Sequence, residues 1–166
     1  MSIIGLMEWL ANTPLSIWTR ESLWAYPIIE TIRVLGLCLF LGFTVMLDLR
    51  LLGLAMKRTP ASEVCGKLEP WMVGGFVVML CSGAMLFYGD PVKMYGSIFM
   101  RVKFLMLALA GLNVLAFKKG AYRTVREWDL NAVTPVRAKV AAGLSLALWT
   151  GIVAAGRAIA YFLPAG

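Results

Sequence analysis

Five charged side chains interrupt otherwise apolar stretches of the chain and are the residues best placed to do chemistry. They lie near the starts of two long apolar stretches and near the end of a third: Glu30, Arg33, Arg101, Lys103 and Arg157. If those stretches cross a membrane, charges at that depth cost several kcal/mol unless paired, hydrated or extended to the surface. Such residues are a functional-site hypothesis, and their excess of positive charge favours an anion or a polar head group as ligand.

A purely structural interpretation of the same residues stays open. Glu30 would pair with Arg33 or Arg157 inside the protein. The long side chains of Arg101 and Lys103 would extend along the helix to the membrane surface. In that case the cluster holds ion pairs and surface contacts only, and binds nothing.

A second polar position, formed by Asp48 and Arg50, lies near the other end of the first long stretch. Asp48 follows Glu30 by 18 residues, which is five helical turns, so the two return to the same face. Arg33 is three residues from Glu30 and shares that face. We therefore expect the first helix to carry a polar stripe that faces protein.

Other chemistry has little support in the sequence, and we expect no cofactor, no metal and no catalytic residue. The chain contains no histidine, so a histidine-ligated haem is excluded. Three scattered cysteines form no CxxC pair, and the ten methionines form no MxxM or CxxM pattern that would suit copper. Catalytic motifs such as GxSxG and HExxH are missing as well, so no enzyme class has positive support.

Composition places the charged residues in a membrane protein. Of the 166 residues 60% are hydrophobic, and the mean hydropathy is +0.79. A chain of this composition is too apolar to be a small domain with a water-facing surface. The 16 basic residues outnumber the 9 acidic ones but are spread between apolar blocks, which disfavours nucleic acid as a partner. Membrane lipids are the simpler partner.

The apolar pattern predicts an all-α fold, a polytopic membrane four-helix bundle in one transmembrane domain. The expected elements are an interfacial amphipathic helix over about 2–18 and membrane spans over about 27–56, 70–89, 99–118 and 139–162. Pro70 is expected to open the second span, because proline suits a helix start. A short helix docked on the bundle is the alternative for 2–18. The small residues of the last span predict close helix packing there.

Basic residues in the connections predict the orientation. They concentrate in the loops over about 57–69 and 118–138, so the positive-inside rule puts these loops in the cytoplasm. Both termini would then lie outside. The expected location is a bacterial inner membrane, with all five residues of the cluster in its outer half.

Several strings resemble, over nearly the whole chain, an uncharacterised family of small four-helix bacterial membrane proteins. They are TPLSIWTRESLWAYPIIETIRVLGLCLFLG, LDLRLLGLAM, LALAGLNVLAF and LSLALWTGIVAAGRAIAYF. The family pattern has a histidine in an ETIHVLG-like string and another after a LNALVF-like string, where this chain has Arg33 and Lys118. More distantly, the helices are similar to bacterial copper-resistance proteins and a haem-pathway oxidase, which use intramembrane histidines. The resemblance supports the fold, and the replaced histidines weaken a cofactor.

Three functions follow from these observations. The first is a non-enzymatic accessory subunit or homo-oligomer that packs against partners in a membrane complex. The second is a protein that binds or transports an anionic ligand, a quinone or a lipid at the outward-facing cationic cluster. The third is a haem- or copper-related redox protein.

Overall fold

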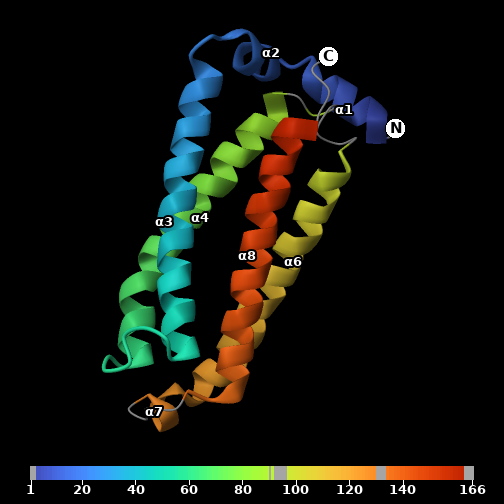
Figure 1. The fold of residues 1–166 in the computed structure, drawn as a ribbon. Helices are drawn as coiled ribbons and strands as arrows, with labels where there is room; N and C mark the ends of the chain where they lie inside the picture. The colour runs from blue at the N-terminus through green and yellow to red at the C-terminus, as the bar shows by residue number, and fades with distance from the viewer. Residues whose placement is uncertain (1–2, 90, 92–96, 130–133, 163–166) are drawn as a thin grey trace.

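The computed structural model describes residues 3–89, 91, 97–129 and 134–162, and every regular element within these ranges is helical (Figure 1). The elements are α1 (Ile3–Ala11), α2 (Pro14–Glu21), α3 (Ala25–Leu52), α4 (Ala61–Gly89), α6 (Ile98–Lys119), the 3-10 helix η1 (Ala121–Thr124), α7 (Val125–Trp128) and α8 (Val136–Phe162). The predicted all-α class is confirmed. We call the end of the molecule that carries α1 and α2 the upper end, and the end that carries α7 the lower end (Figure 1).

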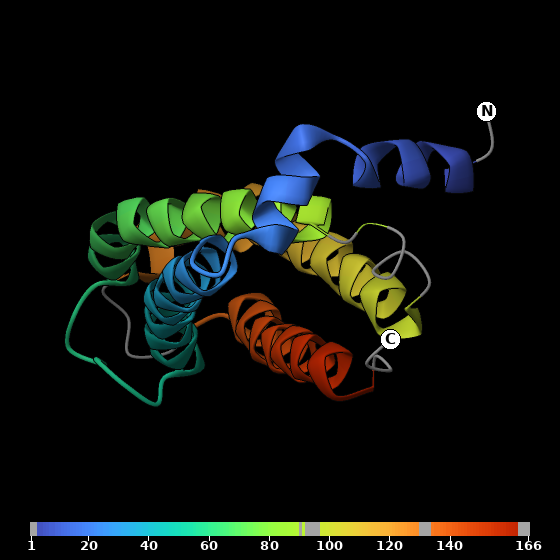
Figure 2. The ribbon, with the colours of Figure 1, turned by 90° about the horizontal axis from the view of Figure 1, so that it is seen from above.

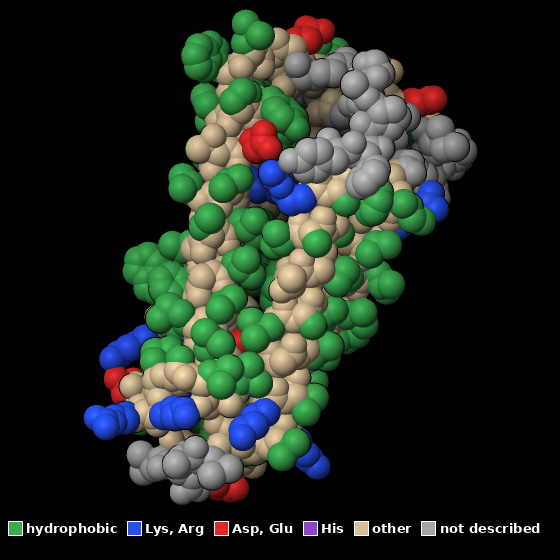
Figure 3. All heavy atoms as spheres, in the orientation of Figure 1, with side chains coloured by type: hydrophobic (Ala, Val, Ile, Leu, Met, Phe, Trp, Pro, Cys, Tyr) green, Lys and Arg blue, Asp and Glu red, His purple; other side chains and the backbone are tan. Residues whose placement is uncertain are grey.

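Four helices, α3, α4, α6 and α8, are long and apolar enough to cross a membrane. Even α6, with 22 residues, is about 33 Å long at 1.5 Å per residue, against a hydrocarbon core of about 30 Å. On the face seen in Figure 3, hydrophobic side chains cover the middle of the molecule, and lysines and arginines gather towards its two ends. The chain is a membrane protein with four candidate spans.

Helix α3 ends four residues earlier than predicted, at Leu52 and not at Met56. Gly53 follows with φ of +75°, a left-handed conformation that glycine adopts without steric cost. Its backbone N–H donates to the carbonyls of Arg50 and Leu49, which would otherwise lack partners at the helix end. A glycine cap therefore stops the helix although the following residues are still apolar.

The prediction that Pro70 opens the second span is wrong, because α4 begins at Ala61 and contains Pro70 in its interior. Proline removes one helical hydrogen bond and bends the helix without ending it. The turns before Pro70 are held by packing, since Ala61, Val64 and Cys65 are buried in the core at the lower end. Tertiary packing here outweighs the local cost of the proline.

The region predicted as one interfacial helix consists of two helices, α1 and α2, separated at Asn12 and Thr13. Ser16 and Thr19 of α2 are buried, and the Ser16 hydroxyl donates to the Gly89 carbonyl at the end of α4 over 3.4 Å. Helix α2 is thus docked on the bundle, as the alternative prediction had it. Helix α1 extends from α2 past the edge of the bundle at the upper end and keeps Trp9 exposed (Figure 2).

The long helices form two pairs, α3 with α4 and α6 with α8, and the packing of α3 on α8 joins the pairs (Figures 1 and 2). Within the described ranges, no Cα atom of α4 lies within 8 Å of a Cα atom of α6. Side chains bridge the space between them: Met72, Phe76 and Met79 of α4 pack against a core that includes Ala110 of α6. The centre of this core is a T-shaped contact between Phe40 of α3 and Trp149 of α8, with ring centroids 4.5 Å apart.

Helices α3 and α4 approach each other closely at Gly36 of α3 and Gly75 of α4. A Cβ atom added to Gly75 would lie 2.8 Å from the Phe40 nitrogen and 2.9 Å from the Gly36 carbonyl oxygen. Both glycines are buried. Glycine is required here because two backbones occupy the space of a side chain.

At the lower end, short polar contacts tie the connections to the helix ends. The Asp129 carboxylate accepts hydrogen bonds from the backbone N–H of Ser62 over 2.9 Å and from the Ser62 hydroxyl. It therefore satisfies donors in the first turn of α4, as a capping residue would. Trp128 is buried beside it, and its indole N–H donates to the Ala121 carbonyl over 3.1 Å.

Candidate functional site

Two residues of the predicted cluster, Arg33 and Lys103, come together between the helix pairs near the upper end. Arg33 lies on α3, half-buried, with its guanidinium against α4. A Cβ atom on Gly83 would lie 4.0 Å from the Arg33 Cζ and Nε atoms. The glycine therefore leaves a flat stretch of α4 on which the guanidinium rests.

Lys103 occupies the corresponding position in the second helix pair. It is half-buried on α6, and a Cβ atom on Gly156 of α8 would lie 3.8 Å from its Nζ atom. Each of the two cations thus lies against a glycine of the helix packed beside its own. The positive charges of Arg33 and Lys103 are also close enough to repel each other. We refer to these two residues as the cationic pair.

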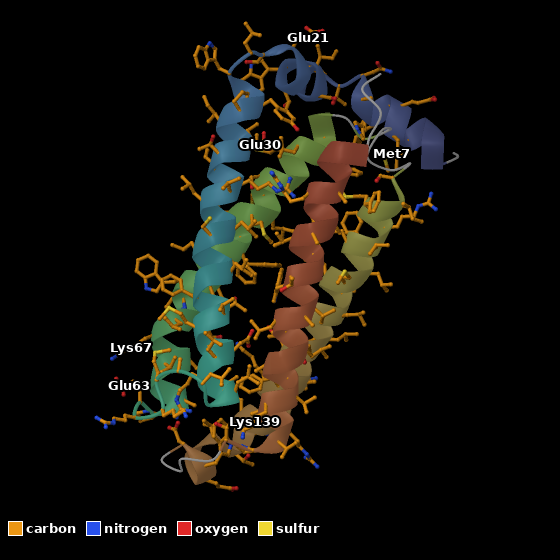
Figure 4. All side chains as sticks on the ribbon, viewed as in Figure 1. Met7, Glu21, Glu30, Glu63, Lys67 and Lys139 are labelled. Atoms are coloured by element: carbon orange, nitrogen blue, oxygen red, sulfur yellow. The ribbon has the colours of Figure 1, made fainter. Side chains whose placement is uncertain are left out.

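No carboxylate of the described residues forms an ion pair with either member of the cationic pair. The ion pairs found in those ranges join Glu63 to Lys67 and Glu69 to Lys118. Both belong to the lower half of the molecule, where Figure 4 shows Glu63 and Lys67. Two half-buried positive charges therefore lie near each other with no negative side chain bonded to them in this part of the structure.

The other three predicted cluster residues, Glu30, Arg101 and Arg157, lie towards the upper end but are exposed. Glu30 is one turn above Arg33 on α3 (Figure 4). The prediction that α3 turns its polar stripe towards protein is therefore wrong at Glu30. Ile29 takes the buried position there and packs with Ala25 and Leu86. Burial of an apolar side chain decides which face of the first turns points inwards.

At the lower end of α3, Asp48 and Arg50 are both buried, with 4% of each residue exposed. Arg50 has a structural role, since its Nε–H donates to the Thr59 carbonyl over 2.7 Å and so holds the connection to α4. Asp48 faces α8, where the Ser145 hydroxyl is its hydrogen-bonding neighbour. Sequence reasoning missed Ser145, and no spacing along the chain connects a serine on the last helix with an aspartate on the first.

The two positions at which the family pattern has histidine lie far apart in the fold. Arg33 is in the upper part of α3, whereas Lys118 lies in the last turn of α6 and is bonded to Glu69 of α4. The two side chains are near opposite ends of the helices and do not share a site. Within the described ranges, no group of three or more histidine, cysteine, aspartate or glutamate residues could hold a metal ion.

Comparison with known proteins agrees with the resemblance seen in the sequence strings. No curated protein and no solved structure is significantly similar to the chain. A sequence profile described as a family of unknown function, DUF6644, matches residues 17–162, which include α3, α4, α6 and α8. Because the match covers most of the chain, this membrane protein belongs to the DUF6644 family of unknown function.

Proposed function

We propose that the protein binds an anionic group, a phosphate or a carboxylate, at the cationic pair of Arg33 and Lys103. The observation that carries the proposal is the meeting of two half-buried positive charges from different helix pairs without an acidic partner among the described residues. An anion between them would replace their repulsion by two attractive contacts. Charge-assisted hydrogen bonds of this kind are among the strongest in proteins.

The two side chains suit an anion with several oxygen atoms. The planar guanidinium of Arg33 can donate two parallel hydrogen bonds to a phosphate or carboxylate. The ammonium group of Lys103 adds a compact charge from the other helix pair. Exposed Arg101 and Arg157 lie near the same end and would raise the local concentration of anions. The anion is either the head group of a lipid or a small solute.

The test is lipid binding by variants of the purified protein. Lys103→Met and Arg33→Gln, each in nanodiscs of mixed phosphatidylglycerol and phosphatidylcholine, should retain about tenfold less phosphatidylglycerol than wild type in native mass spectrometry. The matched controls are Lys119→Met and Arg137→Gln, which remove exposed basic residues near the lower end. Equal retention by all four variants would contradict the proposal. Displacement of bound lipid by inorganic phosphate would identify a solute site.

The basic loops support an orientation with both termini outside a bacterial inner membrane and with 57–69 and 118–138 in the cytoplasm. Two leucines provide matched probes, because Leu23 between α2 and α3 is 87% exposed and Leu54 after α3 is 70% exposed. In a cysteine-free background, Leu23→Cys should react with an impermeant maleimide in intact cells. Leu54→Cys should react only after the cells are opened. The reverse pattern would overturn the orientation.

An accessory or oligomeric role has its own support in α6. Of its 22 residues only Ala110 is buried, so most of its apolar surface is left for lipid or for another helix. In a subunit of a membrane complex, or in a homo-oligomer, this surface is where a partner helix would pack. The native mass spectra described above also report the oligomeric state, because a homo-oligomer has a multiple of the mass of the chain.

A further inference from the structure

A crevice between α3 and α8 opens on the surface of the molecule towards its lower end. Its volume is about 220 Å³. Most of the lining is apolar, and its polar side-chain groups are two threonine hydroxyls, one carboxylate and the indole N–H of a tryptophan. The lining residues are Leu41, Thr44, Val45, Asp48, Leu146, Trp149, Thr150 and Val153. Thr150 is exposed and lies at the rim, whereas Asp48, Thr44 and Trp149 are buried. The crevice therefore leads from the lipid-facing surface to a buried acidic group.

The Asp48 carboxylate is not fully satisfied by the protein. Its Oδ2 atom is buried and has no hydrogen-bond partner among the described residues. The neighbouring hydroxyl of Thr44 donates to the Phe40 carbonyl over 2.8 Å, and Thr150 donates to the Leu146 carbonyl over 2.7 Å. Arg50, two residues away, donates its Nε–H to Thr59. A buried polar atom without a partner costs free energy, so a donor entering the crevice would be bound.

We propose that this crevice binds an apolar molecule that carries one hydroxyl or ammonium group, which donates a hydrogen bond to Asp48 Oδ2. The apolar lining contacts the body of the molecule, and the carboxylate selects its polar end. The site is distinct from the cationic pair, because it lies towards the other end of α3 and prefers a donor to an anion. Its occupant and the anion can therefore bind independently.

The size and position of the crevice limit what can enter. Sites that enclose whole drug-sized ligands measure roughly 300–1,000 Å³, and this crevice is smaller. It fits the polar end and the first carbon atoms of a longer molecule, whose remainder stays in the lipid. A primary alcohol, a phenol or an amine on an alkyl or isoprenoid chain has this form. Water alone fits poorly, since only a few of the lining groups are polar.

The experiment uses photoreactive probes on the full chain in phosphatidylcholine nanodiscs. Three alkyl diazirines of equal length end in a hydroxyl, an ammonium or a methyl ether, and labelled peptides are mapped by mass spectrometry. The hydroxyl or the ammonium probe should label residues 41–48 and 146–153 about tenfold more than the methyl ether, which cannot donate. Labelling by only one of these two probes would identify the donor as neutral or cationic.

Asp48→Leu separates recognition by the carboxylate from general partition into the crevice. In this variant the preference for the hydroxyl or ammonium probe should disappear, while the methyl ether probe labels the same residues as before. Persistent labelling by the ether shows that the variant is folded and the crevice is open. Equal labelling of wild type by all three probes, or a preference that survives in Asp48→Leu, would overturn the proposal. Failure of every probe to label these two segments would also overturn it.

Discussion

Gly75→Ala should unfold at a clearly lower temperature than the wild-type protein, with a loss of about 2 kcal/mol in the free energy of unfolding. The added Cβ atom would lie 2.8 Å from the Phe40 nitrogen and 2.9 Å from the Gly36 carbonyl oxygen. Both neighbours are backbone atoms, so neither can rotate away, and α3 must move away from α4. Loss of the contact weakens the most extensive helix pairing of the fold. Circular dichroism of the protein in detergent during heating measures the effect.

The adjacent glycine provides the control. A Cβ atom on Gly74 meets nothing within 4 Å, and the residue is exposed. Gly74→Ala should therefore be neutral or slightly stabilising, because alanine favours the helix over glycine by about 1 kcal/mol. Gly36→Ala should fall between the two, since its nearest neighbour is the Cγ1 atom of Val78 at 2.9 Å. If the two adjacent variants unfold at the same temperature, the backbones are not in contact at this crossing.

This crossing also shows where sequence patterns stop being informative. The small residues of the last helix predict close packing there; Ala142 is buried, and a Cβ atom on Gly151 would lie 2.1 Å from the Cε atom of Met106 on α6. Yet Gly143 of the same helix meets nothing within 4 Å, whereas a Cβ atom on Gly75 of α4 would lie against the backbone of α3. A small side chain permits close approach, but the partner helix and its rotation decide whether the approach occurs. Those are properties of the whole bundle.

Long apolar stretches were more informative, because burial of about 20 residues in lipid is a large and local effect. Helices α6 and α8 begin and end within about three residues of the bounds predicted for the third and fourth spans. Pro70 predicts too late a start for α4, because proline is typical of a helix boundary, whereas the buried side chains of Ala61 and Val64 extend the helix through it. Local rules fail where tertiary packing supplies more free energy than one hydrogen bond.

The candidate sites were predictable in part. Charged residues in apolar helices pointed to Arg33, Lys103 and Asp48, because such residues are rare and costly. Their neighbours were not predictable: Gly83 and Gly156, against which the cations lie, come from other helices. A single sequence contains the types of these residues but not the angles at which their helices face one another.

A second large loss of stability is expected when the contact between the two helix pairs is disrupted. Trp149 of α8 is 5% exposed and meets the Phe40 ring of α3 with centroids 4.5 Å apart and an interplanar angle of 72°. Trp149→Ala removes this edge-to-face contact and leaves a cavity in the core that α3 shares with α8. Replacement of a buried aromatic residue by alanine costs about 3 kcal/mol or more. Thermal unfolding in detergent should show a loss at least as large as that of Gly75→Ala.

Two further variants determine whether the lost stability comes from the aromatic contact between the helix pairs. Trp24→Ala removes a tryptophan that is 76% exposed, and it should change the unfolding temperature little. Trp149→Phe keeps a ring against Phe40 and should recover most of the stability. Because α4 and α6 do not meet through their backbones, α3 and α8 supply most of the contact between the pairs. An alanine variant as stable as wild type would mean that lipid, and not this aromatic contact, holds the two pairs together.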